Sequence, residues 1–90
     1  MFLELRISKK TMSHVASGHP EITREIILDA FYDEYSIDMK VKYGRRSILC
    51  KAEGGTMLTI IGRPEGTTLH MVTARPMSET EKTQYRRRRK

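Results

Sequence analysis

The sequence is poor in the residues that build disulfide frameworks and metal sites. Its 90 residues contain one cysteine, Cys50, and no tryptophan. A single cysteine excludes an intramolecular disulfide and any zinc site made from several thiolates, and it fits a reducing cytoplasm. The three histidines, His14, His19 and His70, do not have the spacing of metal ligands. We therefore expect neither a metal nor another cofactor.

Long apolar runs are also missing. No apolar segment approaches the roughly 20 residues that would span a bilayer. Residues 1–6 include Glu4 and lack the apolar core of a signal peptide. We expect a cytoplasmic protein with no membrane partner. The length favours one domain, which we place at residues 1–85, followed by a basic tail at residues 86–90.

Charge is unevenly distributed along the chain. The formal net charge is +6, and the tail, Arg-Arg-Arg-Arg-Lys, supplies five of these charges. Residues 21–38 hold six acids and one base, whereas residues 40–75 hold seven bases and two acids. This asymmetry predicts a polyanion on one surface and a basic partner on another, although solvated faces and a frayed tail would give the same pattern.

Hydrophobic periodicity divides the chain into short elements. Residues 2–7 alternate as a strand, and Ser8 can then cap a helix that ends at Gly18. Thr23 can cap a second helix, whose apolar stripe is the clearest in the sequence. The period then changes to two, and strands are expected at residues 37–43, 47–52, 56–63 and 68–75.

Turn residues and a capping box complete the predicted order. We expect an interruption at residues 44–46, a hairpin at Gly54-Gly55, a turn at residues 64–67 and a last helix starting at Ser78. The predicted fold is α+β: a short N-terminal strand, two helices, an antiparallel, curled sheet of three to four strands, and a short C-terminal helix.

Two arginines end neighbouring predicted strands. Thr73 lies two residues before Arg75, so the two side chains share a strand face. If the two strands pair antiparallel, Arg63 and Arg75 lie at opposite ends of the pair, and Thr59 lies nearer Arg75. Lys51, on the preceding strand, could lie near either end of the pair. Cationic side chains on one sheet face could cradle a phosphodiester, and a solvated face with scattered charges is the alternative.

The aromatic and titratable residues each allow a structural interpretation. His19, at the helix junction, either braces a turn or transfers protons, for which an imidazole is suited. His70 alternates with Val72 and Ala74, which indicates a packed or edge histidine. Tyr85 either anchors the last helix or stacks beside a phosphate. Cys50 is expected in the core.

Several short motifs together resemble a known group of nucleases. The segment Gly18-His19-Pro20-Glu21-Ile22-Thr23, the helix after it, and the strand ending Val72-Thr73-Ala74-Arg75-Pro76 resemble the barnase–EndoU–colicin–RelE superfamily. The same ending, followed by Ser78-Glu79-Thr80-Glu81 and Tyr85, is similar to that of BrnT-like toxins, in which Ser-Ala-Arg precedes a helix with Glu and Tyr. Those toxins usually have an N-terminal Trp-Asp and a Lys-His-Gly, whereas this chain has no tryptophan and has His-Pro-Glu.

The resemblance implies a toxin of a type II toxin–antitoxin system that cleaves mRNA as a metal-independent endoribonuclease. Its partners would be RNA, either free mRNA or mRNA on the ribosome, and a cognate antitoxin protein. The implied catalytic residues are His19, Arg63, Thr73 and Arg75. The basic segment and the tail, rather than the resemblance, supply the candidate RNA-binding residues, which are Lys51, Arg45, Arg46, Tyr85, Arg86 and Arg87. Other interpretations are a non-catalytic binding module of the same fold and an antitoxin-like regulator, although the Gly18–Ile22 linker is unlike that of a helix-turn-helix.

Overall fold

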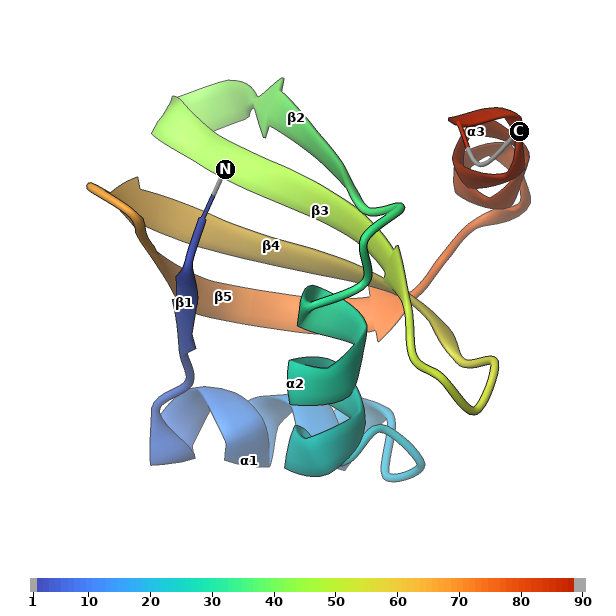
Figure 1. Ribbon diagram of the computed structural model, residues 1–90. Helices are drawn as coiled ribbons and strands as arrows, with labels where there is room; N and C mark the ends of the chain where they lie inside the picture. Colours follow the sequence, from blue (N-terminus) through green and yellow to red (C-terminus); the bar gives the residue numbers. More distant parts are fainter. Residues whose placement is uncertain (1, 89–90) are drawn as a thin grey trace.

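The structure, a computed structural model, describes residues 2–88 and has the predicted α+β architecture (Figure 1). The elements, in chain order, are β1 (Glu4–Arg6), α1 (Lys9–Gly18), α2 (Arg24–Phe31), β2 (Ile37–Val41), β3 (Arg45–Lys51), β4 (Met57–Glu65), β5 (Thr68–Pro76) and α3 (Glu79–Arg88). No helix within residues 2–88 is long and apolar enough to cross a membrane.

Both predicted N-caps are present. The Ser8 hydroxyl accepts a hydrogen bond from the Thr11 backbone N–H (3.1 Å), and the Thr23 hydroxyl accepts one from Ile26 (3.2 Å). Each satisfies an N–H that the first helical turn leaves unpaired. The sequence therefore predicts where α1 and α2 begin.

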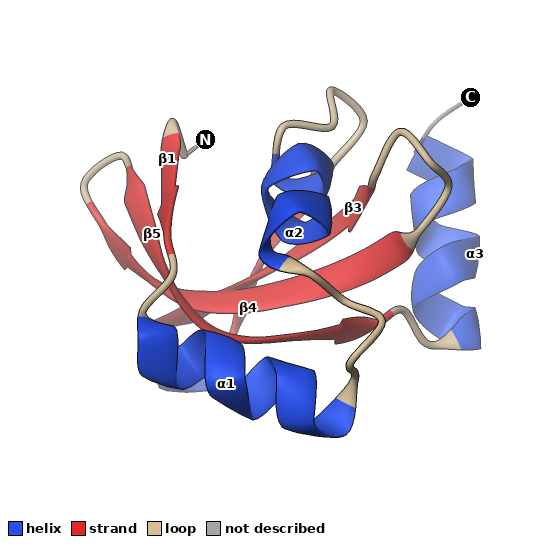
Figure 2. Cartoon of the chain, turned by 90° about the horizontal axis from the view of Figure 1, so that it is seen from below, coloured by secondary structure: helices blue, strands red, loops and turns tan. Residues whose placement is uncertain are grey.

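Five strands form one mixed sheet in the order β1-β5-β4-β3-β2. β2, β3, β4 and β5 pair antiparallel as predicted, and β1 adds a parallel edge beside β5. The helices α1 and α2 lie on one face of this curled sheet (Figure 2). We call the opposite side the open face. In both views α3 lies near the end of β5, away from the β4–β5 turn.

Alternation along the strands divides the side chains between the two faces. Leu58 and Ile60 belong to the main core beneath the helices, together with Ile27 and Leu69, and all four are fully buried. A smaller cluster on the open face contains Leu49, Met77 and Tyr85, with Ile37, Met39 and Met57 packed against it. The sheet therefore carries buried apolar side chains on both faces where Tyr85 packs.

Two strand boundaries differ from the sequence prediction. The β2–β3 connection is a short 3₁₀ turn at Lys42–Gly44, and β3 already begins at Arg45. At the β4–β5 hairpin, Pro64 and Glu65 continue β4 instead of turning. Beyond Gly62 β4 has no paired residue on β3, so a proline there interrupts no ladder on that side. The positive φ of Gly66 (60°) makes the turn.

A β-bulge in β5 changes which residues share a face. Ile61 pairs with Thr73 but Gly62 pairs with Met71, which leaves Val72 as the additional residue. Ala74 therefore lies in the core with Met71, whereas His70 lies on the open face beside Arg63. The prediction that His70 shares a face with Ala74 is wrong, because strict alternation fails across the bulge.

Asp33, just after α2, connects three parts of the fold. One carboxylate oxygen accepts hydrogen bonds from the Lys51 backbone N–H (3.0 Å) and from the Tyr85 hydroxyl (2.5 Å). The other oxygen accepts one from the Tyr35 backbone N–H (3.0 Å). The end of β3 and the last helix are therefore tied to the same side chain. No buried side-chain polar atom within the described chain lacks a hydrogen-bond partner.

Gly62, beside the bulge, provides a test of this register. A Cβ at this position would lie 2.7 Å from the His70 carbonyl oxygen and 2.7 Å from Leu69 Cγ. We expect Gly62→Ala to lower the free energy of unfolding by about 1–3 kcal/mol in denaturant titrations. Gly54→Ala is the control, because a Cβ there meets nothing within 4 Å. Equal stability of the two variants would contradict the close approach of β4 and β5.

Candidate functional site

The open face has two polar regions, one at each end of β4 and β5. We call the first, formed by Thr59, Arg75, Ser78 and Glu81, the α3 end. We call the second, formed by Arg63, Glu65 and His70 with Arg6 of β1, the hairpin end. Thr59 pairs with Arg75 and Arg63 pairs with His70, so the two ends lie four positions apart along β4. At about 3.3 Å a residue this is roughly 13 Å.

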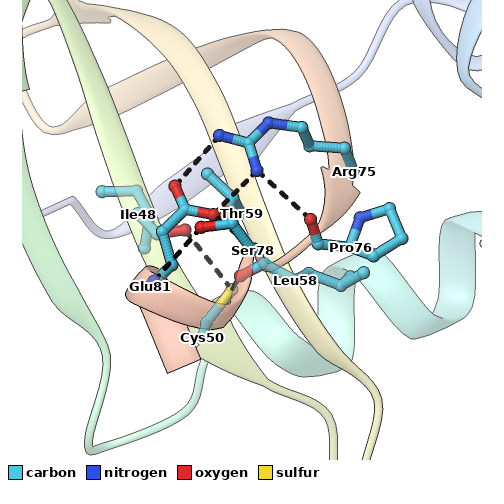
Figure 3. A network of polar contacts seen from close by, with 8 residues as sticks. All are labelled: Ile48, Cys50, Leu58, Thr59, Arg75, Pro76, Ser78 and Glu81. Carbon is cyan, nitrogen blue, oxygen red and sulfur yellow. Dashed lines mark hydrogen bonds and ion pairs between the residues drawn. The ribbon is translucent and has the colours of Figure 1, made fainter. Parts of the chain in front are cut away.

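Glu81 dominates the α3 end (Figure 3). Its two carboxylate oxygens accept bidentate hydrogen bonds from Arg75, at 2.7 and 3.0 Å. The Thr59 hydroxyl (2.9 Å) and the Ser78 backbone N–H (2.8 Å) also donate to Glu81. The Ser78 hydroxyl in turn accepts from the Glu81 backbone N–H, which completes the predicted capping box.

This geometry changes the titration of both charged partners. The hydrogen bonds from Arg75 above all, and also those from Ser78 and Thr59, lower the pKa of Glu81 to about 2, against the opposing effect of burial. The same hydrogen bond raises the pKa of Arg75. Glu81 thus already fills the position that a phosphate would take on Arg75 and Thr59. Thr73, the other residue predicted here, is half-buried and pairs with Ile61 toward the middle of the open face.

The hairpin end is more open and contains a histidine. His70 Nε2 lies 2.8 Å from Glu65 Oε1, and the His70 and Glu65 side chains are 29% and 80% exposed. Register puts Arg6 beside His70 on β1 and Arg63 beside it on β4. The pKa of Glu65 is lowered, first by the hydrogen bond and charge of His70 and then by the charges of Arg6 and Arg63. A carboxylate, an imidazole and two guanidinium groups therefore meet here.

The structure does not bring the four predicted catalytic residues together. Arg63 lies at the hairpin end, whereas Arg75 is at the α3 end, as antiparallel pairing predicted. His19 caps the C-terminus of α1 in the helix layer, where its backbone N–H donates to the Val15 carbonyl (2.7 Å). Its Nδ1 is 3.7 Å from Glu21 Oε2. His19 thus has the bracing position that was one of its two interpretations.

The predicted RNA-binding residues are also dispersed. Arg46 points to the helix side, where it forms a bidentate ion pair with Asp38 (2.8 and 2.9 Å) and lies over the Phe2 ring. Alternation directs Arg45 to the open face. Arg86 and Arg87 are exposed on α3, and the predicted tail overlaps this helix through Arg88; residues 89–90 lie outside the described chain.

Lys51 and Tyr85 border a cavity of 460 Å³ that is also lined by Asp29, Asp33, Glu34 and Glu53. Four carboxylates around one lysine make this an unfavourable place for a polyanion. The Tyr85 ring is 1% exposed and its hydroxyl donates to Asp33. Tyr85 is therefore the anchor of α3, and its buried ring leaves no face on which a base could stack.

A second cavity, of 530 Å³, lies between the N-terminal segment, the end of α2 and β2. Phe2, Leu3, Tyr32 and Ile37 are among its lining residues, and none of the predicted catalytic residues lines it.

No group of three or more potential metal ligands occurs within residues 2–88. Cys50 is fully buried, as expected, and burial raises the pKa of its thiol, with a smaller contribution from Asp33.

The sequence matches no protein-family model and no curated protein. Among solved structures, the chain is similar to the crystal structure of the ribonuclease toxin BrnT of Brucella abortus. The TM-score is 0.59 at 15% sequence identity, over 84% of this chain and 97% of that chain. The two chains share a fold. The shared fold agrees with the architecture that the resemblance to BrnT-like toxins implied.

Sequence reasoning missed Glu65, His70 and Glu81 as members of polar clusters. Glu65 and His70 flank a short hairpin turn, and this spacing alone could have put them side by side. Glu81 was recognised from its capping-box spacing to Ser78, but nothing local to the helix indicates that its carboxylate also reaches back to Arg75.

The lowered pKa of Glu81 makes the α3 end sensitive to acid. Because the folded-state pKa is about 2 and the ordinary value is 4.5, the ionised form stabilises the fold. The stabilisation is complete above pH 4.5 and is lost as the pH falls toward 2, by up to about 3 kcal/mol. We expect Glu81→Gln to lose this contribution at pH 7 and to have a flatter dependence of unfolding free energy on pH.

Glu79→Gln is the matched control for this measurement. Glu79 is in the first turn of the same helix, its side chain is 87% exposed, and its ion pair with Lys82 is 3.5 Å long. The variant should therefore behave like the parent protein. Identical pH profiles for Glu81→Gln and Glu79→Gln would show that the Arg75–Glu81 pair does not stabilise the fold.

Proposed function

We propose that this protein is a metal-independent endoribonuclease that cleaves mRNA and acts as the toxin of a type II toxin–antitoxin pair. The observation that carries this proposal is the sheet itself: one face is covered by α1 and α2, while the hairpin end of the other is open and places Arg6 and Arg63 on either side of His70. A fold similar to that of a ribonuclease toxin supports the same interpretation. RNA supplies its own nucleophile, the 2′-hydroxyl, so this reaction needs no metal.

We propose that RNA lies along the open face, with its phosphates near Arg63 and Arg45. Arg63 is exposed, and Arg45 is half-buried on the neighbouring strand. Thr73, between the two ends, can donate a hydrogen bond to the same backbone. We assign Arg75 a structural role, because its guanidinium is occupied by Glu81.

The proposed partner is a cognate antitoxin that covers this open face with acidic side chains. The alternative surface, the acidic side of α2, is partly used within the fold. Asp29 accepts a hydrogen bond from the Glu53 backbone N–H (2.7 Å), and Asp33 accepts from three other groups. Carboxylates that hold the fold together are less available to a basic partner.

A non-catalytic RNA- or protein-binding module of the same fold is the second candidate. The bidentate Arg75–Glu81 pair favours it, since the guanidinium at the α3 end is already bound by the protein's own carboxylate. Such a module would bind RNA without cutting it, so the two candidates differ in one measurable property, the loss of mRNA.

Expression in bacteria from a tightly repressed promoter tests the proposal. We expect growth arrest with loss of total mRNA, and relief of both by Arg63→Ala at equal soluble protein, because phosphate binding weakens. Lys10→Ala, which removes an exposed charge from α1 in the helix layer, is the control and should remain toxic.

Two outcomes would contradict this proposal. Folded protein that leaves growth and mRNA unchanged would favour the non-catalytic module. Relief of the arrest by Arg75→Ala, but not by Arg63→Ala, at unchanged stability would return the site to the α3 end.

The basic run at the end of α3 predicts salt-dependent binding. Deleting residues 86–90 should weaken RNA binding and flatten its dependence on salt, because fewer counterions are released. Turnover at saturating RNA should change little. The measurement is fluorescence anisotropy with labelled RNA at several salt concentrations. Unchanged affinity at about 0.1 M salt would exclude the basic run from RNA binding.

A further inference from the structure

The hairpin end has a composition that the proposed RNA contact does not explain. Phosphate binding needs cations alone, yet a histidine lies between Arg6 and Arg63, and this histidine contacts Glu65. The α3 end has no histidine, and His19 lies in the helix layer. Within residues 2–88, His70 is thus the histidine that shares the open face with arginines on both neighbouring strands.

Glu65 determines which nitrogen of His70 is available. A carboxylate only accepts hydrogen bonds, so Nε2, 2.8 Å from Glu65 Oε1, must carry the proton. The neutral imidazole then has its lone pair on Nδ1, and no hydrogen bond from the rest of the described chain reaches that atom. The half-buried His70 is thereby oriented as a base, and Glu65 stabilises the imidazolium that forms when Nδ1 takes a proton.

We propose that His70 is the general base of the ribonuclease, that Glu65 positions it, and that Arg6 and Arg63 bind the scissile phosphate. This inference rests on the proposed function and specifies its site. His70 Nδ1 takes the proton of the 2′-hydroxyl, the 2′-oxygen forms a bond to phosphorus, and the bond from phosphorus to the 5′-oxygen breaks. The 5′-oxygen takes a proton from water, and the resulting hydroxide takes the proton back from His70. The products are a 2′,3′-cyclic phosphate and a 5′-hydroxyl.

The two arginines have the right charge and position for the phosphate. Arg6 is beside His70 on one strand and Arg63 is beside it on the other, so their guanidinium groups can approach a phosphate from both sides. Arg6 also contacts Glu4 through a long ion pair of 3.4 Å, and the side chains of Arg6 and Glu4 are 64% and 53% exposed. Such an exposed contact is readily exchanged for a phosphate.

The experiment compares cleavage of a fluorogenic RNA oligonucleotide by purified variants. We expect His70→Asn to reduce kcat at least 100-fold, the usual range for loss of a general base, with little change in KM. Arg63→Ala should mainly raise KM and weaken binding of an uncleavable analogue with a 2′-deoxy scissile nucleotide. His14→Asn, which removes an exposed histidine from α1, should leave both constants unchanged.

A pH profile separates a proton-transfer role from a structural one. For the parent protein, kcat should fall as the pH is lowered and His70 becomes protonated, and in His70→Asn the residual rate should lose this dependence. The charged groups on this face around His70 are Glu65 and Arg63 on β4 and Arg6 on β1, and Glu4 on β1 pairs with Arg6. Glu65→Gln should alter the acidic limb and keep measurable activity, because the amide still accepts from Nε2 but carries no charge.

The outcomes distinguish this inference from the proposed function. Cleavage by the parent protein with an equally active His70→Asn variant would overturn the role of His70 and leave the ribonuclease proposal standing. Products with a 3′-hydroxyl and a 5′-phosphate would also overturn the assigned chemistry. Absence of cleavage by folded parent protein, on free RNA and on translating ribosomes, would overturn both.

Discussion

The carboxylate of Asp33 is the contact on which the arrangement of the last helix depends. α3 is almost entirely polar, with Tyr85 as its one buried residue, so apolar packing alone would hold it weakly. The same oxygen of Asp33 that receives the Tyr85 hydroxyl also receives the backbone N–H of Lys51, where β3 ends. The end of α2, the edge of the sheet and α3 are therefore fixed together. Because the Asp33 carboxylate accepts these internal hydrogen bonds, it is less available to a basic partner protein.

The same internal pairing decides which cations remain for a ligand. Arg46 is held by Asp38 on the helix side, and Arg75 is held by Glu81 beneath α3. Each pair is bidentate, and a bidentate carboxylate satisfies the donor geometry that a phosphate would use. Arg63 has no such partner among the contacts within the described chain, and it is exposed. The number of basic residues in the sequence is thus a poor guide to the binding surface, because some of them are paired with acidic side chains within the fold.

Local signals in the sequence predicted much of the fold and little of the site. The caps at Ser8 and Thr23 and the capping box at Ser78 rest on hydrogen bonds within three residues, so the residues themselves predict them. The separation of Arg63 from Arg75 followed from antiparallel pairing. The contact between Glu81 and Arg75 crosses from α3 back to β5, and the contact between Asp33 and Tyr85 joins residues 52 positions apart. No periodicity encodes such contacts, and they determine which charges stay available.

The bulge at Val72 shows how a single backbone irregularity shapes the candidate site. Continued alternation from Leu69 and Met71 would have directed Thr73 and Arg75 into the core and left Ala74 on the open face. One additional residue in β5 reverses this, so polar side chains on both sides of the bulge face the same way. Gly62 lies opposite the bulge, and a side chain there would clash with the neighbouring strand. One register of β4 and β5 therefore accounts for the glycine, the bulge and the shared polar face. In this register the hairpin end has a histidine between two arginines. At the α3 end, Arg75 is paired with Glu81.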